Sequence, residues 1–174
     1  MSDPSLASDR VRLRPLEQDD LEHVVALHND LAIKTLTLSW PLPVTRDACA
    51  SWIASHTNVG DDATWVIASP AGDFWGIVRV FDLDRLSRHA EVGLYLHADA
   101  RGQGVGQAAL ALVNAWAFDF FGLHRLEARI LATNAPALQL FEQIGFAREG
   151  VQREREFRGA EYHDVVLLGM LAPS

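Results

Sequence analysis

The sequence is poor in cysteine, in basic residues and in long apolar runs, and each shortage excludes a class of protein. Cys49 is the only cysteine in 174 residues, which excludes an internal disulfide and is ordinary for a reducing cytoplasm. Lys and Arg number 15 against 23 Asp and Glu, so the formal net charge is −8. This balance argues against a primary nucleic-acid binder, although it does not oppose a cationic partner such as an amine.

Membrane and export signals are lacking as well. No apolar run approaches the length of a membrane span, and residues 1–10 lack the basic and apolar parts of a signal peptide. We therefore expect a cytoplasmic protein with no membrane and no nucleic-acid partner. The histidines lack metal-ligand spacing such as H-x-x-x-H, so we expect no metal site.

What remains is the composition of one soluble domain. Hydrophobic residues make up 49% and charged residues 22% of the chain, and its length allows a sizeable core. No internal repeat or linker divides the sequence. We expect a single domain over residues 1–174, with residues 1–9 as a frayed N-terminus.

The periodicity of apolar residues predicts an α+β fold. Strands are expected around Val11–Leu13 and over residues 64–69, 74–82, 88–97, 124–132, 147–157 and 162–171, with helices after residue 19, after Thr45, over residues 104–121 and after Asn134. Short connections in the middle indicate an antiparallel meander, and the strand–helix–strand crossover that follows makes two strands parallel. The prediction is thus a mixed, mostly antiparallel sheet of about seven strands with about four helices.

The stretch "RGQGVGQAAL" (residues 101–110) places three glycines before a helix, where free backbone N–H groups and the helix dipole favour an anion such as a pyrophosphate. A P-loop is excluded because no Lys followed by Ser or Thr comes after Gly106. A dinucleotide fingerprint is disfavoured because Gln107 stands where its third glycine belongs. The remaining pattern, Arg101-x-x-Gly104-x-Gly106, also occurs in plain tight turns.

Four segments in order resemble the GCN5-related N-acetyltransferases (GNAT), and within them the group like the ribosomal-protein N-acetyltransferases RimJ and RimL. They are "VRLRPLEQDD", "FDLDRLSRHAEVGLYLHADARGQGVGQAAL", "LHRLEARILATNAPALQLFEQIGFAREG" and "REREFRGAEYHDVVLLGML". The resemblance covers residues 10–171 and implies the GNAT fold, in which a splayed sheet holds acetyl-CoA between two parallel strands. It is compatible with a homodimer.

The same resemblance suggests where the coenzyme binds. The pyrophosphate is expected at the glycine loop, and the pantetheine arm along the backbone of the preceding strand, as an added strand would pair. Asn134, at the head of the next helix, is expected to contact the coenzyme or a water beside it, although it also fits a plain N-cap. The predicted coenzyme residues are Leu96, His97, Arg101, Gly102, Gln103, Gly104, Val105, Gly106, Gln107 and Asn134.

Two carboxylates are candidates for the general base that an ammonium acceptor needs. Glu156 corresponds by resemblance to the base of the RimL-like group. Glu91 lies among apolar residues, where burial raises a carboxyl pKa toward a useful range. Each also fits an ion pair, Glu156 with Arg153, Arg155 or Arg158 and Glu91 with Arg79 or Arg88.

The general acid is not evident from the sequence. Ala137 and Phe141 stand where family members carry Ser and Tyr, and neither can donate a proton. Tyr162 and His163 are other candidates.

Together, the motifs and the resemblance predict an acetyl-CoA-dependent N-acetyltransferase. Its acceptor would be a primary amine of a protein N-terminus, a polyamine or another small molecule; the alternative is an inactive acyl-CoA-binding regulatory protein. Trp40 is expected to border the acceptor pocket and to stack on a cationic substrate.

Overall fold

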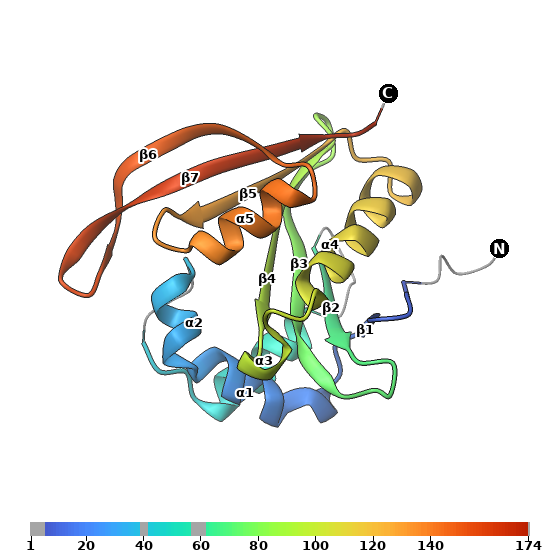
Figure 1. Cartoon of the computed structure of the whole chain (residues 1–174). Coiled ribbons are helices and arrows are strands. Elements are labelled where there is room, and N and C mark those ends of the chain that lie inside the picture. The colour runs from blue at the N-terminus through green and yellow to red at the C-terminus, as the bar shows by residue number, and fades with distance from the viewer. Residues whose placement is uncertain (1–5, 39–41, 57–61, 174) are drawn as a thin grey trace.

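The computed structural model describes residues 6–38, 42–56 and 62–173 (Figure 1). Seven strands form one sheet in the order β1-β2-β3-β4-β5-β7-β6. The strands are β1 (Arg12–Pro15), β2 (Ala63–Ala68), β3 (Phe74–Asp84), β4 (His89–Leu96), β5 (Arg125–Leu131), β6 (Ala147–Arg158) and β7 (Glu161–Leu171). Among these described strands, only β4 and β5 pair in parallel, and the other neighbours are antiparallel. The predicted fold class is confirmed.

Five α-helices cover the two faces of this sheet. They are α1 (Leu21–Asn29), α2 (Leu31–Leu36), α3 (Arg46–Ser55), α4 (Val105–Ala115) and α5 (Ala135–Gln143). One core lies under α4 and α5, where Leu110 and Phe141 are buried, and a second lies under α1 and α3, where Leu27 and Ile53 are buried. Alternate residues of a strand point to opposite faces, so β3 and β4 contribute to both cores.

Two details differ from the sequence prediction. The six-residue α2 was missed, because it follows α1 after one residue, Asp30, whose side chain accepts a hydrogen bond from the Ala32 N–H and begins the new helix. The frayed N-terminus is wrong for residues 6–9. The Leu6 carbonyl accepts a hydrogen bond from Leu13, and Ala7 forms a bridge with Arg12.

Within the described ranges, no helix combines the length and the apolar character needed to cross a membrane.

Candidate active site

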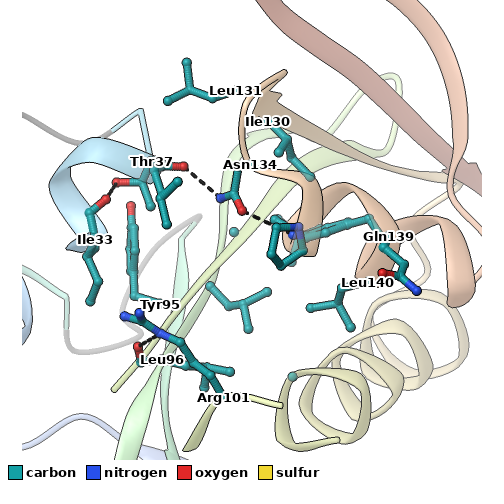
Figure 2. Close-up of a pocket in the computed structure, with 18 of the residues that line it drawn as sticks. Ile33, Thr37, Tyr95, Leu96, Arg101, Ile130, Leu131, Asn134, Gln139 and Leu140 are labelled. Atoms are coloured by element: carbon teal, nitrogen blue, oxygen red, sulfur yellow. Dashed lines mark hydrogen bonds between the residues drawn. The ribbon is translucent and has the colours of Figure 1, made fainter. Parts of the chain in front are cut away.

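The parallel strands β4 and β5 separate soon after they meet. The two strands pair from His89, opposite Arg125, to Glu91, opposite Glu127. Beyond Glu91 the strands diverge, and a pocket of about 880 Å³ opens between them. Helix α2, the glycine loop and α5 form its other walls (Figure 2). The pocket therefore follows from the one parallel pair in the sheet.

The three glycines of the loop have different roles. Gly102 (φ +71°) and Gly104 (φ +77°) adopt left-handed backbone, and Gly104 is the N-cap of α4. Gly106 instead lies buried inside α4, where an added Cβ would stand 2.9 Å from the Leu140 side chain. Gly102 and Gly104 thus shape a loop that lines the pocket, and Gly106 lines it as well while leaving room for the Leu140 side chain of α5.

The predicted coenzyme residues divide between the pocket and its surroundings. Most of them line it: Leu96, Arg101, Gly102, Gly104, Val105, Gly106, Gln107 and Asn134. Gln103 and His97 are not among the lining residues. The Gln103 amide donates to the Asp99 carbonyl, and the His97 ring stands beside Phe74, with centroids 5.6 Å apart. Burial and the nearby His23 lower the pKa of His97.

Asn134 joins two walls of the pocket. Its side-chain oxygen accepts a hydrogen bond from the Ala137 N–H (3.2 Å), which makes it the N-cap of α5. Its amide nitrogen donates to the Leu36 carbonyl at the end of α2 (2.8 Å). The N-cap reading of this residue is confirmed, and the side chain also faces the pocket.

Glu91 lies at the inner end of the pocket, where β4 and β5 are still paired. Its carboxylate accepts a 2.7 Å hydrogen bond from Arg129 Nε. The sequence had suggested Arg79 or Arg88 as the partner, and that expectation is wrong. Burial raises the pKa of Glu91, and the charge of Arg129 only partly offsets this effect. A carboxylate with a raised pKa in a cleft is suited to accept a proton near neutral pH.

Glu156 does not line the pocket. It lies on β6, opposite His163 of β7, and its carboxylate pairs with Arg158 (3.2 Å) and Arg155 (3.4 Å). Glu156 therefore forms ion pairs with arginines, as one of the two interpretations of the sequence predicted.

The candidate proton donors Tyr162 and His163 lie in the same hairpin. The Tyr162 ring is exposed beside Phe157, and the His163 ring contacts the Arg158 carbonyl at 3.0 Å. Ala137 and Phe141, which stand where family members carry Ser and Tyr, lie on α5 and line the pocket.

Sequence reasoning missed a tyrosine in the pocket. Tyr95 lies on the same face of β4 as Glu91, four residues further on, and its ring points toward Thr37 of the α2 end (Figure 2). Burial raises the pKa of Tyr95, so its phenol is protonated at neutral pH. The alternation of "EVGLYL" could have identified it, because residues 91, 93 and 95 share one face.

Trp40 lies outside the described residues, so its expected place beside the acceptor remains a prediction. Among the residues that the structure describes, no cluster of three or more His, Cys, Asp or Glu side chains could hold a metal ion.

Comparison with known proteins identifies the family. Residues 10–147 match the family model of the acetyltransferase (GNAT) domain. The chain belongs to this family. It is an N-acetyltransferase, and acetyl-CoA is its co-substrate.

Individual relatives cover nearly the whole chain. A putative phosphinothricin acetyltransferase, YwnH of Bacillus subtilis, is 30% identical over 90% of this chain and 96% of the relative. Spermidine N(1)-acetyltransferase of Vibrio cholerae is 23% identical over 91% of each chain. A crystal structure of the Vibrio cholerae spermidine N-acetyltransferase with CoA and spermine has a TM-score of 0.88 at 22% identity, covering 94% of this chain and 96% of that chain. The acceptor amine named differs between these relatives.

Proposed function

We propose that acetyl-CoA binds in the opening between β4 and β5 and that the acetyl group passes to a primary amine beside Glu91. The observation that carries this proposal is the pocket, which extends from the glycine loop at one end to Glu91 at the other. The acceptors that the fold and the family allow are a protein N-terminus, as in the RimJ/RimL-like group, a polyamine, or another small amine.

The walls of the pocket suit the donor. The N–H groups around Gly102 and Gly104, at the start of α4, can bind the pyrophosphate, and Arg101 stands beside them. Among the residues that the structure describes, no strand pairs with β4 on its β5 side beyond Glu91, so the amides of the pantetheine arm can pair there. Leu140 and Phe141 of α5 supply an apolar wall.

Two side chains supply the proton transfers. Glu91 takes a proton from the ammonium, and the freed amine attacks the thioester carbonyl carbon. As the C–N bond forms and the C–S bond breaks, the departing thiolate takes a proton from Tyr95, which replaces the donors that Ala137 and Phe141 cannot provide. The support for these roles is that both residues lie on one face of β4 and line the same pocket.

A thiol-release assay with acetyl-CoA and a panel of amines tests this proposal. We expect release that depends on both the amine and the enzyme. CoA binding without turnover on any amine would favour the inactive regulatory protein, and failure to bind CoA would overturn the assignment of the pocket.

A further inference from the structure

Gly93 lies in the middle of β4, between the two side chains to which we assign the proton transfers. Residues 91, 93 and 95 share one face of the strand, so Gly93 separates Glu91 from Tyr95 on that face. Gly93 lines the pocket, and because it has no side chain, the face is open between the base and the acid. The reacting carbon of the thioester must lie close to this opening.

Within the described residues, neither the backbone nor the packing requires glycine at position 93. Glycine weakens a strand, and inside one it often marks a bulge or the close approach of a ligand or another backbone. Most of the described glycines have left-handed backbone or a neighbouring atom closer than 3.0 Å to the position that a Cβ would take. Gly93 and Gly150 have neither, and Gly150 stands at a register shift of the β6–β7 pair, whereas β4 pairs regularly with β3 at Gly93. The glycine at position 93 therefore points to a ligand.

The opening above Gly93 has room for about one methyl group in the direction of β3. A Cβ added at Gly93 would stand 3.7 Å from Cε1 of the Phe81 ring, and no other described atom outside its chain neighbours would lie within 4 Å. This distance is an ordinary contact between carbon atoms. A further methylene adds about 1.5 Å, so a chain that continues toward the ring would overlap it.

Phe81 forms a fixed wall on this side of the opening. It pairs across the sheet with Glu91 and lines the pocket. The Arg79 guanidinium lies over the Phe81 ring, 5.0 Å from its centroid, and over the Trp52 ring, 5.7 Å from its centroid. Arg79 is itself held by Asp62 (3.3 Å) and His56 (3.0 Å). The Phe81 ring therefore cannot turn away from Gly93 without losing its cation–π contact.

We infer that Gly93 and Phe81 select the acyl group of the donor. The acetyl methyl occupies the position that a Cβ would take at residue 93, and Phe81 excludes longer acyl groups. This inference rests on the proposed function of the pocket, in which the amine lies at Glu91 and Tyr95 faces the departing sulfur. The acyl chain is then left with the direction across β4 toward β3, where the Phe81 ring stands.

A series of donors tests the inference on the unmodified enzyme. Acetyl-CoA, propionyl-CoA and butyryl-CoA are compared with the best acceptor from the amine panel. We expect kcat/KM to be at least about tenfold higher for acetyl-CoA than for propionyl-CoA, the usual effect of one methylene in a fitted pocket, and lower again for butyryl-CoA. An equal or higher value for propionyl-CoA would overturn the inference and leave the acetyltransferase proposal standing. No turnover with any donor would overturn both.

Phe81→Ala removes the wall that we assign to acyl selection. We expect the ratio of propionyl-CoA to acetyl-CoA kcat/KM to rise by at least about tenfold. Leu83→Ala is the matched control, because Leu83 is also a half-buried apolar residue of β3 but does not line the pocket, and its ratio should not change. The ratio is taken within one variant, so a general loss of activity does not affect it. An unchanged ratio in Phe81→Ala would overturn the inference.

Gly93→Ala tests the same opening should Phe81→Ala fail to fold. Its Cβ takes the place of the acetyl methyl, with an ordinary contact to Phe81 and no backbone strain. We expect the calorimetric Kd of CoA, which has no acyl group, to be unchanged, and kcat/KM for acetyl-CoA to fall at least about tenfold. Gly150→Ala is the matched control, since its Cβ would also meet one side chain, Leu167, at 3.7 Å but lies outside the pocket. Full acetyl-CoA turnover in Gly93→Ala would overturn the inference.

Discussion

Glu91 and Arg129 illustrate how one contact can serve both position and reactivity. The 2.7 Å hydrogen bond fixes the Glu91 carboxylate at the inner end of the pocket, and burial still raises its pKa above the ordinary value. Below that raised pKa the carboxyl is protonated and cannot accept a proton from the acceptor. Activity should therefore fall as pH drops through a value higher than that of an ordinary glutamate.

We expect Glu91→Gln to lower kcat by about 10²–10⁴-fold, the usual contribution of a general base, and to leave the Kd of CoA unchanged. The acid limb of the kcat/KM profile that belongs to Glu91 should also disappear. Steady-state kinetics across pH and calorimetric CoA titration measure both effects.

Glu156→Gln is the matched control for that experiment, since Glu156 also pairs with arginines but lies outside the pocket. A loss of turnover in Glu156→Gln that equals the loss in Glu91→Gln would return the general base to the residue suggested by family resemblance.

Tyr95→Phe removes only the hydroxyl that we assign to the departing thiolate. We expect kcat to fall by about 10–100-fold, with little change in unfolding temperature because the ring stays in place. The loss should shrink with an acyl donor whose thiolate is a better leaving group. The same loss for both donors would mean that the hydroxyl orders the pocket and is not a proton donor.

At the scale of the elements, the glycine loop leads directly into the N-terminus of α4. The left-handed backbone of Gly104 begins α4, and the Arg10 side chain lies on its outer side, where Nη1 donates to the Gln103 carbonyl (3.2 Å). A side chain at Gly104 would meet this guanidinium at 2.9 Å and would also strain the backbone. Both effects should disturb the anion-binding end of the pocket.

We expect Gly104→Val to weaken CoA binding by 100-fold or more, as measured by calorimetry. Gly72→Val is the matched control, because Gly72 also has a positive φ (+104°) but lies in the turn between β2 and β3. Each substitution should cost about 1–3 kcal/mol of stability from backbone strain. Equal CoA affinity in both variants would show that the pyrophosphate binds elsewhere.

Most elements could be predicted because their signals are local. The glycine loop, the Asn134 cap and the alternating strands of the meander each depend on residues close in the sequence. The identity of the partner of Glu91 could not be predicted, because Arg129 reaches it across a parallel pair whose register no local pattern fixes. The contact of Gly106 with Leu140 could not be predicted for the same reason, since Leu140 is on another helix.

At the scale of the whole molecule, the β6–β7 hairpin extends from the body of the domain (Figure 1). The Phe157 and Tyr162 rings are in contact near its tip, with centroids 5.1 Å apart and planes tilted by 59°, and both are more than half exposed. Exposed aromatic pairs of this kind are typical of protein interfaces.

We therefore keep the homodimer as a prediction and assign this hairpin to its interface. Light scattering coupled to size exclusion should give a mass of at least twice 19.2 kDa for the native chain, and a lower mass for the double variant Phe157→Ser, Tyr162→Ser. A Leu86→Ser control, at an exposed residue of the β3–β4 turn, should not change the mass. A monomeric native chain would contradict the prediction.

The central claim is that the opening between β4 and β5 is the site of the acyl donor. A crystal structure of the protein with CoA tests it most directly. The account predicts the pantetheine arm alongside residues 92–96, the pyrophosphate against the N–H groups of residues 102–106, and the sulfur between Glu91 and Tyr95. Coenzyme bound anywhere else on the protein, with this opening closed, would contradict it.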